Sequence, residues 1–222
     1  MTFYVLTLFP QTFSSTFTQS IIKRAVDNKI IKIKTINIRD FAQGKHKTVD
    51  DRPYGGGKGM ILKVDVVARA LESIKPKPYS ILLSASGKKY NQRKARKYSK
   101  KKSLAIICGH YEGVDARVEQ FVDEVISIGD YILTGGEIAS MAIIDSTARL
   151  LPKVINPDSL KTESFTRDST LEYPQYTRPQ NFRNLKVPKT LLKGNHQQIK
   201  LWREKETNKR LIKFRPDLLK KN

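Results

Sequence analysis

Apolar residues recur with two different periods along residues 1–151, and the changes of period predict alternating strands and helices. Short runs of β-branched and apolar residues, typical of buried strands, lie at residues 4–9, 30–38, 80–84, 104–108 and 125–128. Between these runs, apolar residues three or four positions apart predict helices at residues 13–26, 64–74, 91–102, 114–121 and 137–151. Strands separated by helices form βαβ units, so the pattern predicts an α/β fold with a mostly parallel sheet.

The pattern changes at Pro152. Residues 152–188 are rich in proline and follow neither period, which is typical of a linker and irregular loops, and a helical period returns at residues 196–211. Basic residues far outnumber acidic ones in this last part of the chain. We therefore expect a domain over residues 1–155, a linker over 156–162 and a small, basic, helical domain over 163–222.

The charge balance indicates a polyanionic partner. The 42 Lys and Arg residues exceed the 21 Asp and Glu residues, which gives a formal net charge of +21. Such an excess favours nucleic acid as a partner, although a lysine-rich composition accounts for part of it. Residues 87–102 carry many Lys and Arg and no acidic residue, so they form either a nucleic-acid contact or a solvated helix face.

Other classes of protein are disfavoured. No apolar stretch approaches the roughly 20 residues that a membrane-spanning helix needs, so we expect a cytoplasmic protein without a membrane partner. Cys108 is the single cysteine, and the three histidines lie far apart in the sequence. We therefore expect neither a disulfide nor a metal site within the chain.

Two glycine-bounded loops are the strongest candidates for a ligand site. GHYEGVDAR (residues 109–117) and IGDYILTGGE (residues 128–137) each follow a predicted strand. Glycine at the carboxyl end of a strand lets a ligand approach the main chain closely. Ile128, Ile132 and Leu133 offer apolar walls suited to an adenine ring. The alternative is a tight turn from strand to helix.

Two further segments invite chemical interpretations. The run YGGGKGM (residues 54–60) lacks the spacing of a Walker A phosphate loop, so it is either a loop beside an active site or a plain turn. Glu163, Asp168 and Glu172 lie in a proline-containing loop, where carboxylates are usually solvated but can also accept a proton.

Four segments together resemble a known family. HKTVDDRPYGGGKGM, GHYEGVDARV, IGDYILTGGE and EYPQYTRP, in this order and spacing, resemble the bacterial tRNA (guanine-N(1))-methyltransferase (TrmD) family of the SPOUT superfamily. The resemblance implies a homodimer, a deep trefoil knot in the α/β domain and a small helical C-terminal domain. The hydrophobic pattern alone predicts an unknotted, doubly wound sheet, because knots are essentially absent from protein folds in general.

The resemblance also implies an activity. It implies S-adenosyl-L-methionine as the methyl donor and tRNA as the substrate, methylated on ring nitrogen 1 of the guanine 3′-adjacent to the anticodon (position 37). It leaves a requirement for Mg²⁺ open. A ribose 2′-O-methyltransferase of the same superfamily is the nearest alternative, and a non-catalytic RNA-binding protein is the alternative from another class.

The resemblance assigns residues to both parts of the reaction. It implies Glu163 as the general base, Arg149 as the stabiliser of negative charge on the guanine, and Glu112 as a carboxylate beside that guanine. Glu163 stands where the family has Asp, and Ala85 where proline is common. The cofactor-binding residues that it implies are Leu82, Leu83, Ser84, Gly109, Tyr111, Glu112, Gly113, Ile128, Gly129, Asp130, Tyr131, Ile132, Leu133, Gly135 and Gly136.

Overall fold

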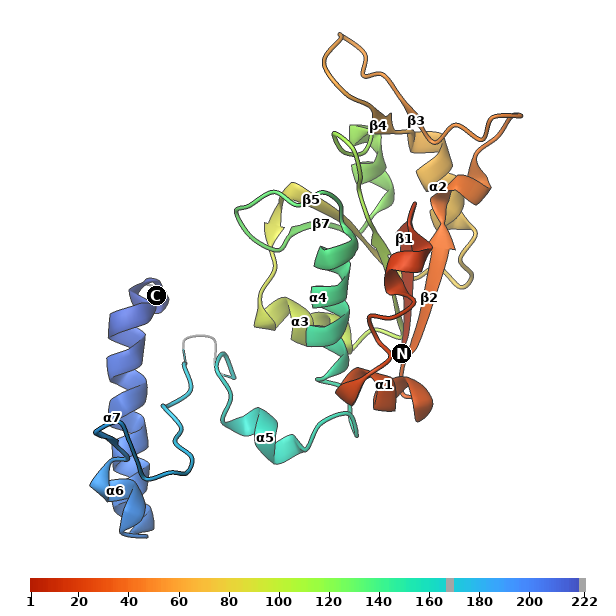
Figure 1. Ribbon diagram of the computed structural model, residues 1–222. Helices are drawn as coiled ribbons and strands as arrows, with labels where there is room; N and C mark the ends of the chain where they lie inside the picture. Colours follow the sequence, from red (N-terminus) through yellow and green to blue (C-terminus); the bar gives the residue numbers. More distant parts are fainter. Residues whose placement is uncertain (167–169, 220–222) are drawn as a thin grey trace. The chain divides into compact units, whose positions relative to one another are not determined.

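The computed structural model describes residues 1–166 and 170–219 (Figure 1). The chain divides into two compact units, residues 1–155 and residues 156–222. Each unit is described by itself.

The first unit contains a five-stranded parallel sheet with the strand order β2-β1-β6-β5-β7. The strands are β1 (Thr2–Thr7), β2 (Lys32–Asn37), β5 (Tyr79–Lys89), β6 (Ser103–Ile107) and β7 (Glu124–Ser127). Each strand overlaps a run predicted from the sequence, so the α/β class and the parallel sheet are confirmed. A separate antiparallel pair joins β3 (Asp50–Asp51) to β4 (Ile61–Leu62).

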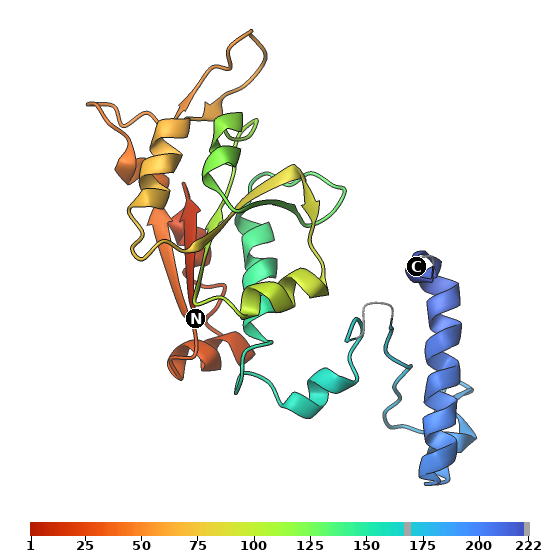
Figure 2. The same ribbon diagram turned by 180° about the vertical axis from the view of Figure 1, so that it is seen from behind.

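Helical segments cover both faces of the parallel sheet. The α-helices are α1 (Ser20–Asp27), α2 (Val64–Glu72), α3 (Gln92–Ser99) and α4 (Glu137–Ala148). The 3-10 helices are η1 (Pro10–Phe13), η2 (Ile38–Phe41) and η3 (Ala116–Phe121). One apolar cluster packs the sheet against α1, α3 and α4, and a second packs it against α2, η2 and η3, as the two opposite views show (Figures 1 and 2).

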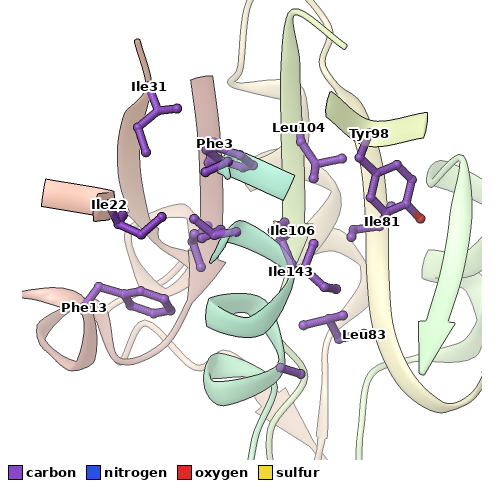
Figure 3. Close-up of a cluster of buried hydrophobic side chains, with 14 of the residues drawn as sticks. Phe3, Phe13, Ile22, Ile31, Ile81, Leu83, Tyr98, Leu104, Ile106 and Ile143 are labelled. Atoms are coloured by element: carbon purple, nitrogen blue, oxygen red, sulfur yellow. The ribbon is translucent and has the colours of Figure 1, made fainter. Parts of the chain in front are cut away.

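Alternation along the strands divides the buried side chains between these two clusters. Leu104 and Ile106 of β6 face the α4 side, whereas Ala105 and Ile107 face the α2 side. Successive side chains of a strand point to opposite faces, and both faces are covered here, so the central strands are apolar throughout. Figure 3 shows the first cluster, in which Ile143 of α4 lies among side chains from the strands.

The helix predicted over residues 13–26 is wrong in its first half, because the α-helix begins only at Ser20. The hydroxyl groups of Ser14, Thr16 and Thr18 donate hydrogen bonds to main-chain carbonyl groups three or four residues earlier. Such local bonds compete with helix formation. The helix predicted over residues 114–121 is shorter as well, and it is the 3-10 helix η3.

Strand β5 is longer than predicted and interrupted. Leu83 and Lys88 both align with Ile126 of β7, so residues 84–87 bulge out of the register. Gly87 permits the crossing, because a Cβ atom there would lie 2.5 Å from main-chain atoms of Ile126. The bulge places Ser84 and Ala85 beyond the carboxyl end of β7, where the loops of the candidate site lie.

Helix α3 is basic and contains no acidic residue, but it pairs with an acidic residue of β7. Glu124 of β7 binds Lys94 at 2.8 Å, accepts a hydrogen bond from the Tyr98 hydroxyl at 2.7 Å, and pairs with Lys97. Burial raises the pKa of the Glu124 carboxyl, but these bonds and one to Tyr79 outweigh it and hold that pKa at about 2 instead of 4.5. Part of the positive charge of residues 87–102 is therefore neutralised inside the fold.

Replacing Glu124 by Gln should lower the free energy of unfolding at about pH 7 by roughly 1–3 kcal/mol. The depressed pKa of the folded state makes this contribution present above about pH 4.5 and lost as the pH falls towards 2. Urea unfolding of both proteins at several pH values measures the difference. A gap between wild type and Glu124→Gln that stays constant down to about pH 3 would contradict the ion-pair explanation.

The second unit contains α5 (Pro157–Lys161), the hairpin strands β8 (Asn181–Phe182) and β9 (Leu185–Lys186), α6 (Lys189–Leu192), α7 (His196–Phe214) and η4 (Pro216–Leu218). The segment predicted as a linker thus contains α5. Along α7, Trp202 contacts the Tyr176 ring, with centroids 6.2 Å apart, and Arg203 lies over the Tyr173 ring. Within the described residues, no helix is both long and apolar enough to cross a membrane.

Candidate active site

A pocket of about 260 Å³ lies at the carboxyl edge of the parallel sheet. Its walls come mainly from three segments: residues 82–85 within β5, residues 109–114 after β6, and residues 126–136, which begin at the end of β7. Glu119 of η3 and Ala139 of α4 complete the lining. This edge is where parallel α/β folds place their ligand sites.

Main-chain hydrogen bonds hold these segments together. Gly136 N donates to Gly109 O at 2.9 Å, and an antiparallel bridge joins His110 to Gly135. On the other side, Glu112 N donates to Met60 O at 3.1 Å, and Leu62 N donates to Gly113 O at 3.0 Å. The pocket walls are therefore fixed to one another and to the segment that leads into α2.

Glycine is required where the walls meet. A Cβ atom on Gly136 would lie 2.7 Å from the Cα of Cys108, and one on Gly135 would lie 2.4 Å from the Glu137 carboxylate. The first clash is with main chain, which cannot move without displacing β6. The two glycines thus bring main-chain groups to the pocket surface where any larger residue would fill the space.

The structure brings together all but one of the cofactor-binding residues predicted from the sequence. Those that line the pocket are Leu82, Leu83, Ser84, Gly109, Tyr111, Glu112, Gly113, Ile128, Gly129, Tyr131, Ile132, Leu133, Gly135 and Gly136. Asp130 does not line it, because its exposed carboxylate points to Lys89, with the two groups 2.9 Å apart.

The charge of the pocket lining is opposite to that of the whole chain. The carboxylates of Glu112 and Glu119 line it, and none of the described Lys or Arg residues does. Acidic side chains repel a phosphate group and favour a ligand that carries positive charge. The pocket therefore suits a cationic ligand with an apolar, ring-containing part.

Glu119 lines the pocket and was missed by the sequence prediction. His110 and Thr134 also line it; they lie in the two predicted loops but were not named individually. Beneath them lies the buried carboxylate of Glu137. The Thr7 hydroxyl donates to Glu137 Oε1 at 2.6 Å, and His110 Nε2 lies 3.6 Å from Glu137 Oε2. Thr7 and Glu137 are 130 positions apart, so only the fold reveals their contact.

The glycine run at residues 54–60 ends against the pocket. Gly59 has a φ of +83°, and a Cβ atom there would lie 2.3 Å from Cγ of Glu112. Of the two interpretations of this run, the structure favours a loop beside the site, with its last residues packed on Glu112.

The other two predicted catalytic residues do not belong to the segments that form the pocket. Arg149 caps the carboxyl end of α4, whereas the amino end of that helix adjoins the pocket at Gly136. A helix of 12 residues is about 18 Å long, further than an arginine side chain reaches. Glu163 belongs to the second unit, where its main-chain carbonyl accepts a hydrogen bond from the Thr166 hydroxyl at 2.7 Å. Asp168 lies outside the described residues.

The fold and the pocket define an α/β protein with a candidate small-ligand site at the carboxyl edge of a parallel sheet. Sequence comparison identifies the family. The model of the family described as "tRNA (Guanine-1)-methyltransferase TrmD" matches residues 1–221. The chain belongs to this TrmD family.

Relatives from several bacteria match nearly the whole chain, and each is named tRNA (guanine-N(1)-)-methyltransferase. The protein of Carboxydothermus hydrogenoformans is 54% identical, with 97% of this chain and 86% of the relative covered. That of Dictyoglomus turgidum is 51% identical, with 98% and 89% covered. That of a Sulfurihydrogenibium species is 49% identical, with 100% and 88% covered.

Proposed function

We propose that this protein transfers a methyl group from S-adenosyl-L-methionine to ring nitrogen 1 of the guanine at tRNA position 37. Membership of the TrmD family supports the reaction. The observation that carries the proposal within the structure is the acidic, glycine-edged pocket, because the proposed methyl donor carries a positively charged sulfonium.

The residues present fit this donor. Leu82, Ile128, Ile132 and Leu133 provide apolar surface for an adenine ring, and the glycines expose main-chain groups that can bond its polar edge. Glu112 and Glu119 supply negative charge towards the cationic part. When bound, S-adenosyl-L-methionine supplies an electrophilic methyl group on its sulfur.

The deep trefoil knot that the family resemblance implies is part of the proposal. The bulge of β5 at Ile126 and the bond from Gly136 to Gly109 hold the pocket segments close together, as such a knot requires. A knotted arrangement holds the walls of the pocket in place without a disulfide.

A homodimer is the second structural part of the proposal. About 18 Å of α4 separates Arg149 from the pocket of its own chain, so a second copy is needed to bring such an arginine to the ligand. Large apolar side chains are also exposed on and beside the pocket loops, as expected of an interface: Phe9, Tyr111, Tyr131, Ile132 and Ile138.

The proposed chemistry follows from the nature of guanine. Its ring nitrogen 1 carries a proton, so methylation requires a base, and negative charge develops on the neighbouring oxygen. In this proposal the Glu163 carboxylate takes the proton and the Arg149 guanidinium stabilises the charge on the oxygen. Glu112, at the pocket mouth, accepts hydrogen bonds from the guanine edge.

Incubation of the protein with labelled S-adenosyl-L-methionine and a tRNA that carries guanine at position 37 tests the proposal. We expect mass spectrometry to locate the label on ring nitrogen 1 of that guanine. Label on a ribose 2′-oxygen would instead indicate a ribose 2′-O-methyltransferase of the same superfamily. Absence of donor binding in calorimetry would favour a non-catalytic RNA-binding protein. Parallel assays with Mg²⁺ and with a chelator determine the metal requirement.

A further inference from the structure

A second charged surface lies at the amino edge of the parallel sheet, the end opposite the pocket. The loops that lead into β2, β6 and β5 meet there, close to the N label in Figure 1. These loops and the strand starts carry seven lysines, six of them exposed and Lys101 partly buried: Lys29, Lys32, Lys75, Lys77, Lys100, Lys101 and Lys102.

Three of these lysines surround an open hollow of about 410 Å³. Lys77 comes from the loop before β5, and Lys101 and Lys102 come from the loop before β6. Tyr79 forms part of the lining, with the Lys101 ammonium group 4.2 Å from its ring centroid. The hollow therefore gathers positive charge from two loops that are far apart in the sequence.

Among the described residues, acidic groups offset only part of this charge. Glu124 pairs with Lys94 and Lys97, but no ion pair is formed by Lys77, Lys101 or Lys102 within the described parts of the chain. Asp123 is the acidic residue of the hollow, and its carboxylate already accepts hydrogen bonds from Ser80 N at 2.7 Å and Ser80 Oγ at 2.9 Å. The excess of positive charge that remains at the hollow favours the binding of an anion.

We propose that this amino-edge hollow binds the phosphate backbone of the RNA substrate at a point remote from the reacting guanine. The proposal rests on the proposed function for the identity of the RNA. Strands of five or six residues separate the two edges of the sheet by roughly 17–20 Å. An RNA helix is long enough to span this distance, whereas a mononucleotide in the pocket is not.

The test uses a triple variant, Lys77→Gln, Lys101→Gln and Lys102→Gln, in the full chain. We expect its affinity for full-length tRNA to fall on the order of tenfold, and the plot of log affinity against log salt to become shallower by about one unit per lost contact. Its affinity for an anticodon stem–loop whose stem is trimmed, so that the fragment is too short to reach from one edge of the sheet to the other, should equal that of the wild type.

The matched control keeps the charge, with Lys77→Arg, Lys101→Arg and Lys102→Arg. This variant should retain the wild-type affinity and salt dependence, because phosphate binding here depends on charge. Unchanged affinity of the Gln variant for full-length tRNA would overturn the proposal, as would an equal loss for the stem–loop. Inorganic phosphate could also displace RNA at equal ionic strength. If it did so equally for full-length tRNA and for the stem–loop, the hollow would be assigned to a free anion instead.

These measurements are separable from the proposed activity. Binding is measured without the methyl donor, so a protein that binds tRNA through the hollow but methylates another atom would refute only the proposed reaction. Thermal unfolding of both triple variants checks that the fold is retained.

Discussion

Replacing Glu163 by Gln should reduce the single-turnover rate of tRNA methylation by about two to four orders of magnitude. The amide has nearly the shape of the carboxylate but cannot take the proton from guanine. Affinity for S-adenosyl-L-methionine should stay close to the wild-type value, because Glu163 lies outside the pocket-forming unit. Rapid-quench kinetics and calorimetry measure the two quantities.

Two further variants sharpen this test. Glu172→Gln removes a carboxylate from the same segment, where Glu172 bonds Gln175, and it should leave the rate near that of the wild type. Glu163→Asp restores the residue type typical of the family and should keep substantial activity. A Glu163→Gln protein that methylates tRNA at the wild-type rate would remove Glu163 from the role of base.

Replacing Gly136 by Ala should both weaken donor binding and destabilise the fold. The new methyl group would lie 2.7 Å from the Cα of Cys108, so the loop of residues 128–136 must move away from Cys108 and Gly109. Overpacking of this kind costs roughly 1–3 kcal/mol, and we expect at least about a tenfold loss of donor affinity. Urea unfolding and calorimetry measure these effects.

Gly135→Ala is the comparison that separates the two effects. Its methyl group would meet the ends of the Glu137 and His110 side chains, which can move aside, so stability should change less than in Gly136→Ala. Equal stability of the wild type, Gly135→Ala and Gly136→Ala would show that the loop of residues 128–136 can move away from Cys108 without cost. That result would contradict the close packing described for this wall of the pocket.

Mixing the Glu163→Gln and Gly136→Ala proteins, at a donor concentration too low to saturate Gly136→Ala, tests the dimer. If Glu163 acts on the pocket of the partner chain, a mixed dimer of Glu163→Gln and Gly136→Ala chains contains one site with both features intact. Partial recovery of methylation on mixing is therefore expected. Recovery requires subunit exchange, which a tag on one chain can follow.

The sequence predicted the parts of this fold that depend on local pattern. Buried strands such as β6 are continuous apolar runs, and the glycines of residues 128–137 mark the turn that forms the pocket wall. The start of α1 was mispredicted, because the hydroxyl bonds of residues 14–18 compete with a helix that the apolar spacing also allows.

Contacts between distant segments could not be predicted from pattern. The acidic partner of α3 is Glu124, which lies 27 positions beyond Lys97, and no helical or strand period connects them. Pattern also does not reveal the hydrogen bond between Thr7 and Glu137 beneath the pocket. Nor does it reveal that β5 pairs with Ile126 a second time, at Lys88. Family resemblance supplied the catalytic assignments, which hydrophobic periodicity alone does not contain.

The main-chain character of the pocket has a consequence for inhibitors. Carbonyl groups of the loops at residues 109–113 and 128–136 remain whatever side chains stand there, and only a substitution by proline removes an amide N–H, so few point mutations can delete these groups. A compound that bonds mainly to these groups should leave resistant strains few escape routes. Substitutions at Gly135 or Gly136, the most direct of those routes, carry the stability and donor-binding costs expected above.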